Sequence, residues 1–209
     1  MERIREMINK KIDSVKGISR MQFAAEILLE AFSSELGLDL NDVNFKDTPA
    51  RMARMYKEIF SGVKDTQDQV DAILDSAFPC NNNQLILMKD IDVYSMCPHH
   101  LLPVHYNIHV AYIPGKDVVG LSKLVRLVEL LAKRPVLQEQ LVEDVSTNLM
   151  KIDGAVGAAC IAEGVHLCMA MRGIKKHAKT VTSSLKGVFL EGGDAKAQQA
   201  RQELMSLIK

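Results

Sequence analysis

The sequence lacks an excess of charge of either sign. Its 209 residues include 26 Lys and Arg and 26 Asp and Glu, so the formal net charge is zero. Without a global field, the chain has no general attraction to nucleic acid or to an anionic membrane surface, and we expect neither as a partner. An anionic ligand would have to be held by a local cluster of cations.

Long apolar runs are also missing. No stretch approaches the roughly 20 apolar residues that a membrane helix needs. The segment 1–5 leads into an amphipathic pattern rather than into the apolar core of a signal peptide. We therefore expect a protein of the cytoplasm that has no membrane partner.

Cysteine is scarce and irregularly spaced. The four cysteines are Cys80, Cys97, Cys160 and Cys168. This spacing makes a poor disulfide framework for a chain of this size, so the cysteines are better interpreted as thiols or metal ligands.

The glycine-rich motifs that cradle phosphates are absent. The sequence has no G-x-x-x-x-G-K-[ST], and Glu191-Gly192-Gly193-Asp194 is not a dinucleotide fingerprint. A nucleotide, if bound, is therefore not held by a P-loop or a Rossmann turn.

The first part of the chain has helical periodicity. Apolar residues recur at helical spacing over 4–12 and 21–29, and Ser19 is placed to cap the second helix. Thr48-Pro49 predicts a helix start, with Thr48 as the N-cap, and a short helix is expected over 70–74. We take residues 1–80 as an N-terminal helical region.

From residue 85 the pattern changes to the alternation of β-strands. It is clearest over 104–112, where every second residue is apolar, which predicts a strand with one solvent-facing side. The sequence has no repeat and no low-complexity linker, so we expect an α+β domain over residues 81–209. The further elements predicted are helices at 122–131 and 138–152, strands at 156–162, 165–171 and 180–189, and a closing amphipathic helix.

Two short motifs carry the residues best suited to bind a metal. They are Cys97-Pro98-His99-His100 and, about 70 residues later, His166-Leu167-Cys168 on a predicted strand. Residues two apart on a strand point to the same face, so His166 and Cys168 would reach one centre together. A set of thiolates and imidazoles suits Zn²⁺.

The number of ligands separates a catalytic from a structural zinc. Cys97, His100 and Cys168 supply three ligands and leave a position open for water, while His99 and His166 remain as nearby bases. Alternatively, the two histidines are ordinary polar residues, or one of them closes the site as a fourth ligand. His105 and His109 face solvent on a strand and His177 lies in a loop, so we assign them no role.

Two further groups of residues are candidates for binding an anionic substrate. Ser122, Lys123 and Arg126 lie at the start of a predicted helix, where free N–H groups and the helix dipole attract anions, although a plain solvated helix face fits them equally well. Arg172 is a third possible phosphate contact. Glu139, in the first turn of a predicted helix, could accept two N–H donors side by side, the pattern that a guanine edge presents.

With these residues assembled, the chain resembles GTP cyclohydrolase I from about Thr48 to its C-terminus. The resemblance rests on several motifs rather than one: 48–56, 95–103, 109–114, 120–126, Arg134-Pro135 with Gln138-Glu139, and 165–173. It implies a zinc ion on Cys97, His100 and Cys168, with His99 and His166 as acid/base groups.

The resemblance also implies the substrate and its contacts. GTP would be converted to 7,8-dihydroneopterin triphosphate and formate. Glu139 and Gln138 would recognise the guanine, and the ribose and triphosphate would be held by Ser122, Lys123, Arg126 and Arg172.

At the level of architecture, the resemblance implies the tunnelling fold, an antiparallel sheet with helices on one face. Subunits of this family pool their sheets into a barrel within a toroidal homodecamer, with active sites at subunit boundaries. We therefore expect a homo-oligomer.

The sequence departs from the family pattern at three places. Pro98 replaces the usual Glu, Tyr106-Asn107 replaces a Gly-containing turn, and Gln140 replaces an Arg. A homologue with an altered purine or pterin substrate is therefore an alternative, as is a zinc-stabilised binding module without activity. Zinc nucleobase deaminases are excluded because their H-x-E and P-C-x-x-C pair is missing, and the pairing of Cys97 with His100 disfavours a zinc-free nitrile reductase.

Overall fold

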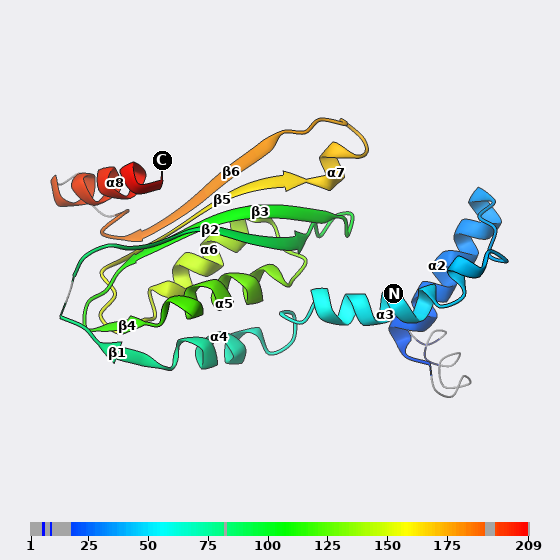
Figure 1. Ribbon diagram of the computed structural model, residues 1–209, viewed down its shortest axis with the longest axis horizontal. Coiled ribbons are helices and arrows are strands. Elements are labelled where there is room, and N and C mark those ends of the chain that lie inside the picture. Colours follow the sequence, from blue (N-terminus) through cyan, green and yellow to red (C-terminus); the bar gives the residue numbers. More distant parts are fainter. Residues whose placement is uncertain (1–5, 7–8, 10–17, 82, 191–194, 209) are drawn as a thin grey trace. The chain divides into compact units, whose positions relative to one another are not determined.

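The computed structural model describes residues 6, 9, 18–81, 83–190 and 195–208, and the chain divides into two compact units, 1–59 and 60–209 (Figure 1). The helix expected over 4–12 lies outside the described residues, apart from residues 6 and 9. The second unit begins about 20 residues earlier than the domain start we took from the sequence, because the helix at 66–74 and the strand at 77–79 belong to it. None of the helices in the described ranges is long and apolar enough to span a bilayer.

The first unit is helical. Helix α2 (Arg20–Leu36) begins where the sequence predicted, because the Ser19 hydroxyl accepts a hydrogen bond from the N–H of Gln22 at 3.2 Å. The helix ends at Gly37, whose φ of 76° is the left-handed conformation typical of such a cap. A 3-10 turn η1 (Val43–Phe45) leads to α3 (Thr48–Ile59). The Thr48 hydroxyl donates to the carbonyl of Asn44 instead of capping α3.

The second unit is built on a four-stranded antiparallel sheet in the order β2-β3-β5-β6, with bounds β2 Ile86–Met96, β3 Pro103–Ile113, β5 Gly157–His166 and β6 Lys179–Gly187. A two-stranded sheet pairs β1 (Ala77–Pro79) with β4 (Asp117–Val119). Helix α4 (Thr66–Leu74) precedes β1. The predicted α+β class with an antiparallel sheet is confirmed.

One face of the large sheet packs against helices α5 (Leu121–Ala132) and α6 (Gln138–Leu149) (Figure 1). The alternation predicted for the central strand holds, since every second residue from Val104 to Tyr112 is completely buried. The apolar stripe of α5 lies against them, with Leu124, Leu127 and Val128 fully buried. This layer is the main core of the unit.

The opposite face of the sheet is not bare. Helix α8 (Ala195–Ile208) packs there through Ala200 and Leu204, which form a second core cluster with Ala111, Ala159 and Phe189. Figure 1 shows α8 on the other side of the sheet from α5 and α6. The expectation of helices on one face therefore holds for α5 and α6 only.

The prediction of two strands at 156–162 and 165–171 is wrong. A single strand, β5, runs from 157 to 166, and the chain then turns into the short helix α7 (Leu167–Ala170). The strand continues through Gly164, which lies opposite Tyr106 on β3. A Cβ at this position would lie 2.6 Å from Cε1 of the tyrosine ring. The glycine is thus required by packing and not by a turn.

A polar cluster joins α6 to β6 beyond the apolar core. Ser184 donates to the Glu143 carboxylate at 2.7 Å and contacts the hydroxyl of Ser146 at 2.7 Å, while Lys186 donates to the other Glu143 oxygen. The hydrogen bonds from Lys186 and then Ser184 hold the pKa of Glu143 below its ordinary value of 4.5. We call Glu143, Ser184 and Lys186 the α6–β6 latch.

We predict that Glu143→Gln costs about 1 kcal/mol of unfolding free energy at neutral pH, because the half-exposed ion pair is lost while a hydrogen-bond acceptor remains. A carboxyl group whose pKa is lower in the folded state stabilises the fold at any pH above its pKa in the unfolded state. This contribution disappears as the pH falls through the pKa of the folded state. The difference between wild type and variant in urea unfolding should therefore shrink between neutral pH and about pH 3.5. A difference that does not change with pH would show that the latch is not electrostatic.

Candidate metal centre and its surroundings

The pairing of the two central strands sets the position of the candidate metal centre. In the β3–β5 register Val104 lies opposite His166, so the segment that precedes β3 meets the segment that follows β5. The first segment carries Cys97 and His100, and the second carries Cys168 in α7. Residues about 70 positions apart are therefore brought to the same end of the sheet.

A tight loop presents the first two of these side chains. The N–H of Cys97 donates to the carbonyl of Leu102, and the N–H of Leu101 donates to the carbonyl of Cys97, both at 2.9 Å. Leu101 has a φ of 50°, which is unusual for a residue other than glycine. Neither bond uses the nitrogen of Pro98, so the missing N–H of this proline leaves the loop closed.

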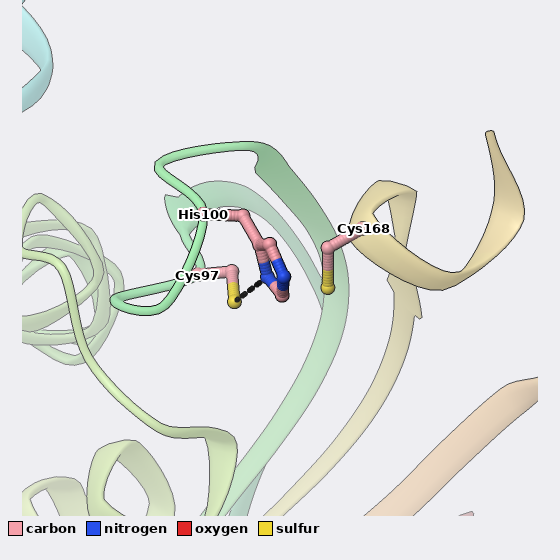
Figure 2. Close-up of side chains that lie close together, drawn as sticks. All are labelled: Cys97, His100 and Cys168. Atoms are coloured by element: carbon pink, nitrogen blue, oxygen red, sulfur yellow. Dashed lines mark hydrogen bonds between the residues drawn. The ribbon is translucent and has the colours of Figure 1, made fainter. Parts of the chain in front are cut away.

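The potential ligand atoms of Cys97, His100 and Cys168 all lie within 4.8 Å of one another (Figure 2). We call these three residues the metal group. The distance from Cys97 Sγ to His100 Nδ1 is 3.7 Å, and two such ligands of a tetrahedral zinc would be about 3.6 Å apart, given ordinary Zn–S and Zn–N bond lengths. Two thiols and an imidazole at these distances fit zinc.

The protonation of the thiols points the same way. Burial, and then the neighbouring sulfur of Cys97, raise the pKa of Cys168, while Arg172 acts in the opposite direction. A bound divalent cation acts against this shift, because coordination favours the thiolate. Cys168 is thus a thiol that a metal would ionise.

Arg172 follows the short helix α7. Its guanidinium contacts Nε2 of His100 at 2.7 Å. Because a guanidinium only donates, Nε2 accepts this hydrogen bond and the Nδ1 that faces Cys97 carries the ring proton; a metal bound at Nδ1 would move that proton to Nε2 and break the contact with Arg172. Arg172 is therefore a neighbour of the metal group.

His166 is held by a buried amide. Gln138, with 2% of its surface exposed, donates from Nε2 to the carbonyls of Ala162 and Thr180, both at 2.9 Å. Because both N–H groups are engaged, its Oε1 can only accept, and the His166 Nε2 lies 2.8 Å away. His166 thus carries a proton on Nε2 and keeps Nδ1 free. The side chain of Gln138 is fully used in this way.

The other predicted acid/base groups and the acidic residue are close by. His99 places Nδ1 at 3.8 Å from Cys97 Sγ, beside the metal group but outside it. Burial lowers the pKa of His166, and the charge of Glu139 partly offsets this shift, which places Glu139 near that imidazole. Both histidines and the carboxylate therefore surround the same end of the sheet.

The three residues at the start of α5 are not part of this group within one chain. Ser122, Lys123 and Arg126 occupy the first turns of α5, whereas the other end of the helix leads to Pro135, which bridges to Met96 beside Cys97. The helix has 12 residues and is therefore about 18 Å long. Along its axis Ser122 lies about 15 Å and Arg126 about 9 Å before the end at Ala132, so one chain separates the predicted phosphate contacts from the metal group.

Of the histidines to which we assigned no role, His105 contacts the Asp92 carboxylate, and His109 accepts the N–H of Asp90 at 3.1 Å. His177 is exposed in the loop before β6.

Sequence reasoning missed Tyr106. Its ring stands edge-on to His166, with centroids 6.0 Å apart and an interplanar angle of 83°. Burial, and then the charges of Glu139, Cys97 and Cys168, raise the pKa of Tyr106 far above its ordinary value, so the hydroxyl stays protonated. The alternation over 104–112 placed Tyr106 on the buried side, but nothing in the sequence alone placed its ring beside His166.

Comparison with known proteins shows relatives that match most of the chain. A GTP cyclohydrolase 1 of Clostridium perfringens is 46% identical over 79% of this chain and 86% of its own length, and one of Thermoanaerobacter pseudethanolicus is 44% identical over 90% and 95%. Among solved structures, a dihydroneopterin aldolase from Burkholderia thailendensis bound to guanine aligns with a TM-score of 0.36 and 14% identity over 55% of this chain and 93% of that chain, which is too low to bear on function.

The family model described as GTP cyclohydrolase I matches residues 24–209. The match covers both compact units except for the first 23 residues, and it includes every candidate site residue named above. The chain belongs to the GTP cyclohydrolase I family.

Proposed function

We propose that this chain is a GTP cyclohydrolase I, which hydrolyses GTP to 7,8-dihydroneopterin triphosphate and formate. The observation that carries the proposal is the convergence of Cys97, His100 and Cys168 within 4.8 Å, beside a histidine whose Nδ1 is free. Membership of the family supports the choice of GTP as substrate.

The three residues of the metal group would hold zinc. When bound, zinc supplies a Lewis acid that activates water at neutral pH. His166 takes up and releases protons through Nδ1 while Gln138 fixes its ring, and the lowered pKa keeps this imidazole in its basic form near neutral pH. His99, whose Nδ1 lies 3.8 Å from Cys97 Sγ, is the second proton-transfer group.

The base is recognised at the start of α6. Glu139, in the first turn, accepts hydrogen bonds from the two N–H donors on the guanine edge, which adenine does not offer in the same form. Gln138 assists by orienting His166 rather than by offering its own amide. Because the two residues are consecutive on one helix, base recognition and proton transfer are positioned together.

The triphosphate requires cations. A guanidinium has five N–H donors, so the contact of Arg172 with His100 leaves others for a phosphate. Ser122, Lys123 and Arg126 lie about 9 to 15 Å along α5 from its end near the metal group, and we propose that they serve the site of a neighbouring copy. The active enzyme is then a homo-oligomer with each site assembled at a boundary between subunits.

The direct test is to incubate the zinc-loaded protein with GTP and to measure formate and the fluorescence of the oxidised pterin product. We expect formate and pterin in equal amounts from GTP and far less product from ATP. Absence of formate from GTP would reject the proposed activity. Equal turnover of ATP would reject the role of Glu139.

Two variants separate metal binding from proton transfer. We expect Cys168→Ala to lose zinc and activity together, and His166→Ala to keep zinc while turnover falls about 10²-fold or more. The control is Cys160→Ala, because Cys160 is a buried cysteine outside the metal group and its variant should keep both. Loss of stoichiometric zinc in His166→Ala, measured by metal analysis, would make His166 a ligand.

Mixing of inactive variants tests the shared site. Cys168→Ala lacks the metal group, and the double variant Lys123→Ala with Arg126→Ala lacks the cations of α5. Co-assembled in equal amounts, the two should regain about a quarter of wild-type activity at low GTP, because a quarter of the boundaries combine two intact halves.

The matched control mixes Cys168→Ala with His166→Ala. These two changes lie on the same half of the site, so no boundary becomes intact and the mixture should stay inactive. Failure of the first mixture to regain activity, with co-assembly verified, would place the cations of α5 outside the site.

A further inference from the structure

Gly164 lies at a crowded point on the buried face of the large sheet. A Cβ on this residue would lie 2.6 Å from Oε1 of Gln138, and 2.6 Å and 2.8 Å from Cε1 and Cδ1 of Tyr106. The φ of Gly164 is outside the left-handed region, so the backbone itself would accept a side chain. The missing side chain therefore leaves room for two neighbours at once, an amide oxygen from α6 and the edge of a ring from β3.

Both of these neighbours contact His166. The Oε1 of Gln138 accepts a hydrogen bond from Nε2 of the imidazole at 2.8 Å. The ring of Tyr106 stands edge-on to the imidazole with the centroids 6.0 Å apart, which is within the range of favourable aromatic pairs. The imidazole is thus held at one nitrogen by the amide and flanked by the tyrosine ring, and both partners depend on the space above Gly164.

The amide of Gln138 has no freedom to give way. It is almost completely buried, and its Nε2 donates to the carbonyls of Ala162 on β5 and Thr180 on β6, both at 2.9 Å. Moving Oε1 from 2.6 Å to an ordinary contact distance of 3.4 Å from a Cβ at position 164 is a shift of about 0.8 Å. This exceeds the tolerance of a productive catalytic geometry, which is about 0.5 Å.

We propose that Gly164 and Tyr106 are positioning residues for the proton transfer of His166. The bare Cα of Gly164 sets where the amide of Gln138 can lie, and the ring of Tyr106 fixes the imidazole from its flank. Both residues act through His166, so neither has to contact GTP or the metal. The inference rests on the role of His166 in the proposed function.

The first experiment compares Gly164→Ala with the matched control Gly157→Ala at the other end of β5. The control is similarly crowded, because a Cβ on Gly157 would lie 2.8 Å from Cγ1 of Val188 and 3.1 Å from Cδ2 of Phe189. Both variants should unfold at a lower temperature than wild type. Only Gly164→Ala should lower kcat with GTP, by about tenfold or more, while KM changes less and the zinc content stays as in wild type.

The tyrosine ring is tested without adding volume to the core, so this series also decides the matter if Gly164→Ala does not fold. We expect Tyr106→Leu, which removes the ring, to lower kcat more than it changes KM. Tyr106→Phe keeps the ring and should restore most of the lost turnover, since the Tyr106 hydroxyl has no hydrogen-bond partner among the described residues. The control Tyr112→Leu, at an equally buried position of β3, should lower stability and leave kcat unchanged.

A double variant tests whether Gly164 acts through His166. If it does, adding Gly164→Ala to His166→Ala should lower kcat no further, because the group that the glycine positions is already absent. A further fall as large as that caused by Gly164→Ala in the wild-type background would show that the glycine acts elsewhere and would overturn the inference.

The remaining outcomes separate the inference from the proposed function. If wild type releases formate from GTP but Gly164→Ala keeps the kcat of Gly157→Ala, the inference is wrong and the proposed function stands. If Tyr106→Phe loses as much turnover as Tyr106→Leu, the hydroxyl and not the ring is required, which also rejects the inference. If wild type releases no formate from GTP, both are wrong.

Discussion

The structure depends on the antiparallel pairing of β3 with β5. This ladder runs from Val104 opposite His166 to Ile113 opposite Gly157, and its register decides which loops meet at each end of the sheet. A slip of one residue would turn the buried side chains of β3 to the other face, and it would also separate Cys97 from Cys168. The constraint that buries the core is therefore the same one that assembles the metal group.

Much of this could be predicted from the sequence, because the signals were local or specific. The alternation over 104–112 predicted β3 and its buried face, and the apolar stripe that begins at Leu124 predicted α5. The metal group was found because cysteine and histidine occur in two short motifs. In each case the residue type and its spacing were sufficient.

The parts that could not be predicted depend on contacts between distant residues. Gly164 falls between the two strands predicted at 156–162 and 165–171, yet in the structure it leaves room for the ring of Tyr106 on the neighbouring strand. Gln138 was expected to meet the guanine, but two backbone carbonyls and His166 occupy its amide. Ser122 carries a helix-start signal but no information about how far along α5 it lies from the metal group. Strand pairing, amide orientation and such distances are properties of the fold that no single motif contains.

The α6–β6 latch also limits how accurately the site is held. Glu143 is five residues from Gln138, a lever of about 7.5 Å along the helix. A tilt of α6 by only about 4° about the latch would move Gln138 by about 0.5 Å, which is the tolerance of a productive catalytic geometry. The contacts of Ser184 and Lys186 with Glu143 thus affect how accurately the His166 imidazole is positioned, although neither residue contacts it. Changes at the outer sheet edge would then alter turnover by misaligning a helix rather than by altering any group that meets the substrate.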